Sequence, residues 1–111
     1  MNFKNKTAIV TGAASGMGLL FAQNWAELYG NVALCDVNEE VLNQKVSEIN
    51  SKNKGKAIGT VCDVRDYNRI CSVRDTVVEE FHSIDVMANF AGGTAVRMQK
   101  VNSNEYPEFP D

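Results

Sequence analysis

Four short apolar runs alternate along the chain with segments in which apolar residues recur at helical spacing. The runs cover residues 7–11, 31–36, 56–63 and 84–90 and are rich in β-branched side chains. Their apolar character is nearly continuous, which is typical of strands that a parallel sheet buries on both faces. The pattern therefore predicts four parallel strands.

Three helices are predicted between these strands, each from a stripe of apolar residues along one face. The stripes are Met17, Phe21, Trp25 and Leu28; Leu42, Val46 and Ile49; and Ile70, Val73, Val77 and Phe81. Gly30 is a candidate carboxyl cap for the first helix, because glycine commonly follows a helix end. Right-handed crossovers then predict a doubly wound α/β fold with the strand order 3-2-1-4.

Composition and charge exclude several classes of protein. A net charge of -3 with scattered Lys and Arg argues against nucleic acid as a partner. No apolar stretch approaches the roughly 20 residues that cross a membrane, and residues 1–7 lack the apolar core of a signal peptide. The cysteines have no disulfide or zinc-site spacing, so reduced thiols are expected, with Cys35 and Cys62 packed inside strands. We therefore expect a cytoplasmic protein without a metal site.

The first strand leads into a glycine-rich segment that opens the first helix. The segment reads Thr11-Gly12-Ala13-Ala14-Ser15-Gly16-Met17-Gly18. Gly12 permits a sharp turn, Gly16 lets backbone approach a pyrophosphate, and Gly18 lets the helix pack closely on the strand. The helix amino terminus offers N–H donors and partial positive charge to phosphates. Within a βαβ unit this segment predicts a dinucleotide site, to which Ser15 and Met17 also belong.

Two acidic residues end the second and third strands at the same edge of the predicted sheet. Asp36 lies 18 residues after Gly18, where a carboxylate can hold the adenosine ribose hydroxyls. The alternative for Asp36 is a solvated side chain at a strand end. Asp63 is either a second cofactor contact or a cap for the helix that starts near Asp66.

Three motifs in order resemble those of the short-chain dehydrogenase/reductase family and together cover residues 7–93. They are the glycine segment with its Thr-Gly-x-x-x-Gly-x-Gly spacing, the pair Asp63-Val64, and the run Asp85-Val86-Met87-Ala88-Asn89-Phe90-Ala91-Gly92. The resemblance implies that Asp63 and Val64 contact adenine. It also implies that Asn89 lines the cofactor site and that Ala91 and Gly92 pass close to the nicotinamide ribose.

Other positions depart from the family pattern. Phe90 replaces a second asparagine, and His82 replaces a glycine that usually follows the third helix. His82 is expected to be an exposed helix-end residue rather than a catalytic base, because no carboxylate or nucleophile motif accompanies it. The family's catalytic tyrosine is followed four residues later by lysine, and no tyrosine of this chain has that neighbour. No catalytic residue is therefore predicted here.

The resemblance implies a Rossmann-type sheet, truncated after its fourth strand, that forms the NAD(P)-binding portion of an oxidoreductase. The intact protein, about twice this length, would transfer a hydride between the nicotinamide and a small alcohol or carbonyl substrate. NAD is expected in preference to NADP, because Asp36 would repel a 2′-phosphate and no basic residue lies in the glycine segment or directly after the second strand. The alternative is a non-catalytic, regulatory truncated product. The intact protein could also form a homo-oligomer, which the sequence does not decide.

The chain divides into two parts on this interpretation. Residues 1–93 form the dinucleotide-binding half-domain, and residues 94–111, which carry Pro107 and Pro110, form an irregular tail. The fourth strand would then be an apolar sheet edge at which further strands pair in a longer protein. A chain that ended at Asp111 is expected to be marginally folded.

Overall fold

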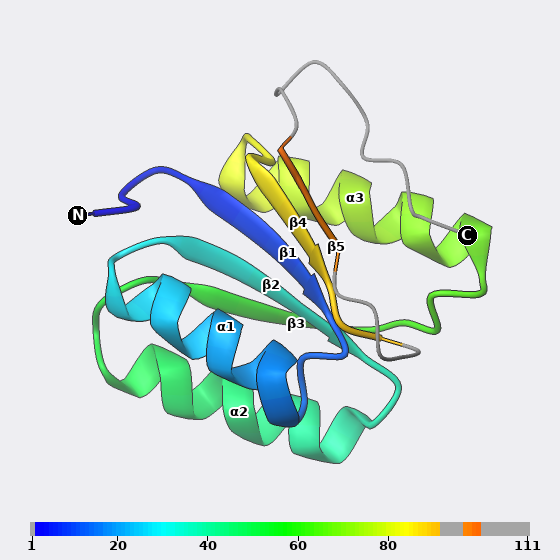
Figure 1. The fold of residues 1–111 in the computed structure, drawn as a ribbon, viewed down its shortest axis with the longest axis horizontal. Helices are drawn as coiled ribbons and strands as arrows, with labels where there is room; N and C mark the ends of the chain where they lie inside the picture. Colours follow the sequence, from blue (N-terminus) through cyan, green and yellow to red (C-terminus); the bar gives the residue numbers. More distant parts are fainter. Residues whose placement is uncertain (1, 92–96, 101–111) are drawn as a thin grey trace.

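The structure is a computed structural model that describes residues 2–91 and the backbone of residues 97–100. Figure 1 shows one sheet with α1 and α2 on one face and α3 on the other. The elements are β1 (Thr7–Thr11), α1 (Gly16–Glu27), β2 (Asn31–Asp36), α2 (Glu39–Ser51), β3 (Ala57–Val61), α3 (Tyr67–Phe81), β4 (Val86–Asn89) and β5 (Arg97–Lys100). The predicted alternation of strands and helices is confirmed, although β3 and β4 are shorter than their apolar runs.

The order of strands in the sheet is β3-β2-β1-β4-β5, and the first four strands run parallel to one another. This confirms the predicted order 3-2-1-4. Thr11 at the end of β1 lies opposite Cys35 of β2 and Asn89 of β4. The chain leaves β1 toward β2 but returns to pair β4 on the other side, so a crevice is expected at this edge.

The strand β5 was not predicted. It runs antiparallel to β4, with Val86 opposite Lys100 and Asn89 opposite Arg97. Its four residues contain no apolar run, and pairing through backbone hydrogen bonds leaves no hydrophobic pattern in the sequence. The expectation of an irregular tail is therefore wrong for this stretch, and β4 is not an unpaired sheet edge. The division of the chain at residue 93 stays a prediction.

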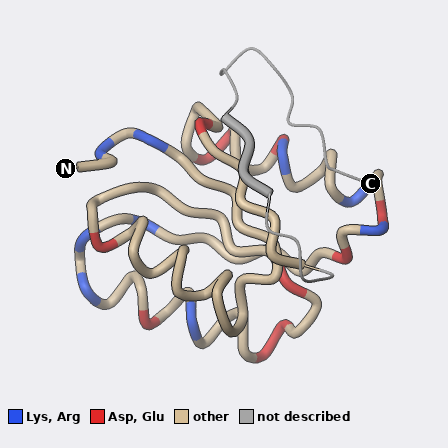
Figure 2. Tube along the Cα trace, viewed as in Figure 1, with Lys and Arg blue, Asp and Glu red and all other residues tan. Residues whose placement is uncertain are grey.

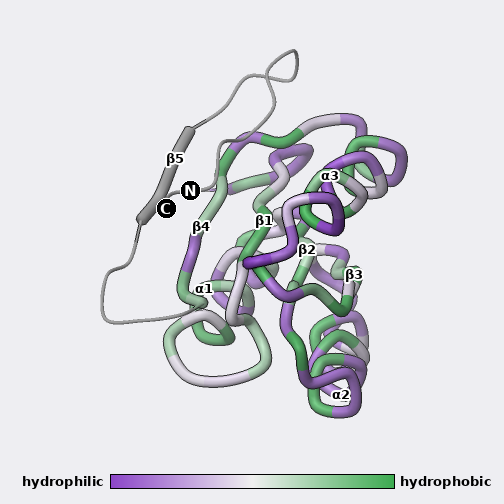
Figure 3. The backbone as a smooth tube through the Cα atoms, turned by 90° about the vertical axis from the view of Figure 1, so that its right-hand side faces the viewer, coloured by the Kyte–Doolittle hydropathy of each residue, from purple (hydrophilic) through white to green (hydrophobic). Residues whose placement is uncertain are grey.

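Two hydrophobic clusters hold the helices on the sheet. Alternate residues of β1 point to opposite faces, so Ala8 and Val10 belong to the cluster under α1 and α2, whereas Ile9 belongs to the cluster under α3. Cys35 and Cys62 are buried free thiols in the second cluster, as predicted. In Figure 3 the strands lie between helices whose turns alternate hydrophobic and hydrophilic colour. Burial of both sheet faces explains the continuous apolar runs.

The buried face of α1 differs from the predicted stripe. Met17 is 67% exposed, and the buried residues of the helix are Gly18, Ala22, Trp25 and Ala26. Small side chains let the helix lie close to the sheet. The buried face is therefore formed mainly by glycine and alanine, which a pattern of large apolar residues does not reveal. Within the described residues, no helix combines the length and the apolar character that a membrane span requires.

The carboxyl end of α1 also differs from the prediction. Tyr29 takes the left-handed conformation, with a φ of 70°, and the N–H of Gly30 donates to the carbonyl oxygen of Trp25 at 3.0 Å. These are the two residues that close a helix end of the Schellman type, with tyrosine at the position glycine usually fills. Gly30 is instead required for packing, because a Cβ there would overlap the ring of Trp25.

Candidate functional site

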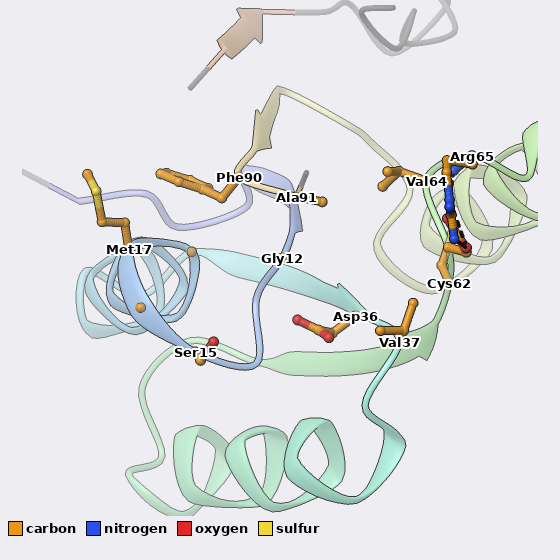
Figure 4. A pocket seen from close by; sticks show the side chains of 13 residues that line it. Gly12, Ser15, Met17, Asp36, Val37, Cys62, Val64, Arg65, Phe90 and Ala91 are labelled. Carbon is orange, nitrogen blue, oxygen red and sulfur yellow. Dashed lines mark hydrogen bonds and ion pairs between the residues drawn. The ribbon is translucent and has the colours of Figure 1, made fainter. Parts of the chain in front are cut away.

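A cleft of about 740 Å³ lies at the carboxyl edge of the sheet (Figure 4). It is lined by Gly12, Ser15, Gly16, Met17, Gly18, Asp36, Val37, Cys62, Asp63, Val64, Arg65, Phe90 and Ala91. In Figure 4, Met17 and Phe90 lie at one end, Asp36 lies between, and Val64 and Arg65 lie at the other end. The cleft therefore has an apolar end and a charged end.

The glycine segment supplies one wall of this cleft. Gly12 and Gly16 have φ angles of 65° and 62°, a region that other residues rarely adopt. A Cβ on Gly18 would overlap the carbonyl oxygen of Gly12, which confirms the close approach of α1 to the segment. Among the described residues, no atom outside the chain neighbours and helix backbone of Gly16 lies within 4 Å of a Cβ placed there, so the backbone is open to a ligand on that side.

The amino terminus of α1 lies at the same wall and has an unopposed positive end. The N-cap Ser15 makes no side-chain hydrogen bond to the helix, and the first turn carries no acidic residue. The N–H groups of a first helical turn have no partner within the helix, and they carry partial positive charge. This end of α1 is therefore suited to an anionic group such as a phosphate.

Asp36 is held in a defined position rather than left in solvent. Its Oδ2 accepts a hydrogen bond from the N–H of Ala14 at 2.9 Å, and its Oδ1 accepts one from the N–H of Asn38 at 3.2 Å. The N–H of Ala13 donates to the carbonyl oxygen of Cys35 at 3.2 Å and ties the same segment to β2. The carboxylate thus faces the cleft from between the glycine segment and the end of β2, which argues against the solvated alternative.

Asp63 also lines the cleft, and it does not cap α3. The cap is Asp66, whose Oδ1 accepts from the N–H of Arg69 at 3.1 Å. Asp63 is instead paired with Arg65, whose Nη2 donates to Oδ2 at 2.7 Å. Hydrogen bonds from Arg65 lower the pKa of Asp63 to about 2, so this carboxylate is charged at neutral pH. The helix-cap alternative for Asp63 is therefore wrong.

Asn89 supports the cleft from behind. Its Oδ1 accepts a hydrogen bond from the hydroxyl of Thr11, and the same hydroxyl accepts one from the N–H of Ala91 at 3.4 Å. These bonds tie the turn after β4 to the end of β1, and Ala91 itself lines the cleft. Asn89 is not among the lining residues. Gly92, the last residue predicted for the site, lies outside the described residues.

Some lining residues escaped prediction, namely Val37, Cys62, Arg65 and Phe90. Val37 follows Asp36, so extending the predicted second strand by one residue would have found it, whereas Cys62 lay within the predicted third strand and was expected only to pack there. Burial raises the pKa of Cys62, which keeps the thiol protonated at neutral pH. This cysteine is therefore a wall of the cleft rather than a nucleophile.

Phe90 forms the apolar end of the cleft. Its ring packs against Phe21 of α1, with ring centroids 5.8 Å apart, and Phe21 in turn stacks on Trp25 at 6.0 Å. The family pattern has asparagine at this position. Phe90 therefore puts an aromatic ring where the pattern has a polar side chain, and this ring connects through Phe21 to Trp25 in the core. No local pattern in the sequence predicted this packing across elements.

The remaining candidates for chemistry are clusters of metal-ligating side chains and the histidine His82. Among the described residues, no group of three or more His, Cys, Asp or Glu side chains is placed to hold a metal ion. His82 is exposed at the carboxyl end of α3 and does not line the cleft, as predicted. Its φ of 69° explains why glycine usually stands at this position in the family.

Comparison with known proteins agrees with this geometry. The family described as short chain dehydrogenase matches residues 6–109. D-threitol dehydrogenase from Mycolicibacterium smegmatis is 36% identical over 87 residues, covering 78% of this chain and 33% of that protein. A short-chain dehydrogenase/reductase from Burkholderia phymatum in complex with NAD is 30% identical, with a TM-score of 0.74 over 78% of this chain and 31% of that chain. An actinorhodin polyketide ketoreductase with NADPH is 35% identical, with a TM-score of 0.74 over 79% of this chain and 33% of that chain.

The match covers nearly the whole chain but only part of each relative. The chain spans between 31% and 51% of the length of the curated relatives it matches. Over that part, the parallel strand order, the glycine segment and the two strand-end aspartates agree with the resemblance noted in the sequence. The chain belongs to the short-chain dehydrogenase family.

Proposed function

We propose that this chain forms the nicotinamide-dinucleotide-binding portion of an oxidoreductase that acts on CH–OH groups. The cleft supports this proposal, because it combines an open helix amino terminus with a positioned carboxylate at one sheet edge. Similar solved structures are described with NAD and with NADPH. One relative is named as a dehydrogenase of the alcohol D-threitol.

The cofactor is proposed to lie along the cleft from its charged end to its apolar end. Its phosphates lie at the amino terminus of α1, its adenosine lies toward Asp36 and Asp63, and its nicotinamide ribose lies toward Ala91. The residues proposed to contact it are Gly12, Ser15, Gly16, Met17, Gly18, Asp36, Asp63, Val64, Ala91 and Gly92. Asn89 is proposed to steady the turn before Gly92 through Thr11.

The described residues bind and orient rather than react. When bound, the nicotinamide supplies the hydride chemistry, and the protein positions it against an alcohol or carbonyl carbon. The walls contributed by Phe90 and Met17 keep that end of the cleft apolar, which limits access of water. The small-molecule substrate, a homo-oligomer of the intact protein and a cytoplasmic location stay predictions.

A preference for NAD over NADP is proposed from one observation, the position of the Asp36 carboxylate. The N–H of Ala14 holds Oδ2 at 2.9 Å, so the charge cannot swing away from the cleft without losing this bond. A carboxylate there accepts hydrogen bonds from both ribose hydroxyls of NAD, whereas the 2′-phosphate of NADP brings like charges together. Asp36 is therefore proposed to select the cofactor as well as to bind it.

The test is a titration of NADH and NADPH against the full chain, followed by the fluorescence of the reduced cofactors. Asp36→Asn removes the charge while keeping an oxygen for the N–H of Ala14, so it perturbs the fold less than alanine. We expect at least about a 10-fold preference of the wild type for NADH, and a ratio within about 3-fold in Asp36→Asn. The matched control is Asp75→Asn, an exposed change of the same charge on α3 outside the cleft. Absence of saturable binding, or a ratio that Asp36→Asn leaves unchanged, would contradict the proposal.

A further inference from the structure

A second charged pair lies at the adenosine end of the cleft. The guanidinium of Arg65 clasps Asp63, with Nε 3.0 Å from Oδ1 and Nη2 2.7 Å from Oδ2. The backbone N–H of Arg65 also donates to Oδ1, at 2.9 Å. A bidentate pair of this kind fixes the orientation of both groups. These hydrogen bonds therefore orient the guanidinium of Arg65 at the cleft.

The clasp leaves part of the guanidinium unused. The hydrogen bonds to Asp63 engage Nε and Nη2, so the donors on Nη1 are not used by this pair. The side chain of Arg65 is 86% exposed, and the residue lines the cleft. Among the described residues that line the cleft, Arg65 is the only Lys or Arg. It is the positive side chain available there to an anionic ligand.

The pairing of β2 with β3 places Arg65 at the end of the cleft that lies beyond Asp36. Asp36 lies opposite Val61 in the parallel register, and the N–H of Cys62 donates to the backbone oxygen of Asp36 at 3.0 Å. The chain then reaches Arg65 three residues after Cys62. Figure 2 shows acidic positions where β2 leads into α2, and mixed charges between β3 and α3. The carboxylate of Asp36 and the guanidinium of Arg65 therefore line the same cleft, Asp36 in its middle and Arg65 at its charged end.

We propose that Arg65 is a specificity-determining residue, which attracts a 2′-phosphate on the adenosine ribose and so limits how strongly the site rejects NADP. This inference rests on the proposed function. Asp36 and Arg65 act in opposite directions on the same group of the ligand, because a carboxylate repels the phosphate and a guanidinium attracts it. Sequence reasoning found no counter-charge in the glycine segment or after β2; the fold supplies one from the end of β3.

Asp63 restrains this effect by holding the guanidinium and offsetting its charge. Removing the Asp63 carboxylate frees Arg65 and leaves its charge uncompensated, so NADP should gain relative to NAD. Removing the Arg65 charge leaves the carboxylates of Asp36 and Asp63 in the cleft without a positive side chain beside them, so NADP should lose relative to NAD. The two substitutions are therefore expected to shift the cofactor ratio in opposite directions, which a merely structural role would not produce.

The experiment measures the Kd values of NADH and NADPH for the full chain in the wild type, Arg65→Gln and Asp63→Asn, at about 0.05 M and about 0.3 M salt. Arg65→Gln should weaken NADPH about 3- to 10-fold more than NADH at the lower salt, and the difference should shrink at the higher salt. Asp63→Asn should shift the ratio toward NADPH by about 2- to 3-fold. Lys56→Gln is the matched control, because it removes an exposed positive charge at the other end of β3.

The outcomes separate this inference from the proposed function. If the wild type binds both cofactors and Arg65→Gln leaves their ratio unchanged, or weakens both equally, the role of Arg65 is overturned and the proposed function stands. A shift in Asp63→Asn toward NADH, or a shift in Lys56→Gln equal to that in Arg65→Gln, also overturns it. If the wild type binds neither cofactor, both proposals fail together.

Discussion

Gly16 and Gly18 lie in the first turn of α1, and the same substitution to alanine should affect the protein differently at the two positions. In Gly18→Ala the new methyl group meets backbone, since a Cβ there overlaps the carbonyl oxygen of Gly12 and lies 2.9 Å from its carbonyl carbon. In Gly16→Ala the methyl group meets no atom of another described segment within 4 Å and projects where the proposed phosphates lie. We therefore expect Gly18→Ala to act on stability and Gly16→Ala to act on cofactor binding.

The magnitudes follow from what each methyl group meets. At Gly18 the segment cannot move away freely, because Ala13 and Ala14 anchor it to β2 through hydrogen bonds of 3.2 and 2.9 Å. Overpacking costs about 1–3 kcal/mol, and weakening one such bond adds about 1 kcal/mol, so a loss of about 2–4 kcal/mol is expected. At Gly16 the cost comes from the φ of 62°. A left-handed alanine costs about 1–2 kcal/mol, offset by about 0.5–1 kcal/mol from the stiffer unfolded chain.

The assay is urea unfolding followed by circular dichroism, combined with the NADH titration on each variant. The expected pattern is a low unfolding midpoint for Gly18→Ala, and for Gly16→Ala a midpoint near the wild type with NADH affinity reduced about 10-fold or more. Equal destabilisation by the two substitutions, or wild-type NADH affinity in a folded Gly16→Ala, would refute the account of the glycine segment.

Two further predictions concern stability. His82→Gly should raise the free energy of unfolding by about 0.5–1 kcal/mol, because it relieves the left-handed φ of 69°; His82→Ala should bring no such gain, and a lower unfolding midpoint for the glycine variant would count against the assignment. The depressed pKa of Asp63, about 2 against an ordinary 3.8, means that its clasp with Arg65 stabilises the fold fully above about pH 4 and is lost as pH falls toward about 2. Urea midpoints of the wild type and Asp63→Asn should therefore converge between these pH values, and a constant difference would exclude this role.

Much of the fold could be predicted because most of its helices and strands produce recognisable patterns in the local sequence. The apolar runs of β1 and β2 reflect burial on both faces, and the glycine segment fixes where β1 ends and α1 begins. The face of α1 was misjudged because the residues that touch the sheet are small, such as Gly18 and Ala22, while the large Met17 lies in the cleft. β5 was missed because its pairing with β4 uses backbone groups that every residue has.

The site was predicted best where one residue carries its own signal. Asp36 stands at a strand end at a fixed spacing from the glycines, so its position followed from sequence alone. Arg65 and Phe90 are adjacent to predicted site residues, but their own side chains enter the cleft through pairing and packing between distant segments, which the sequence does not indicate. The choice between a cap and a site residue for Asp63 also required the structure, because it depends on Asp66 taking the cap.

The central claim is that the cleft at the carboxyl edge of the sheet binds a nicotinamide dinucleotide. Hydrogen–deuterium exchange of the full chain with and without saturating NADH tests it most directly, because it locates the ligand by residue. The account predicts slower exchange in residues 12–19, 36–38 and 62–65, and unchanged exchange in residues 50–56 at the opposite edge of the sheet. Unchanged exchange in the glycine segment, or protection confined to residues outside the cleft, would contradict it.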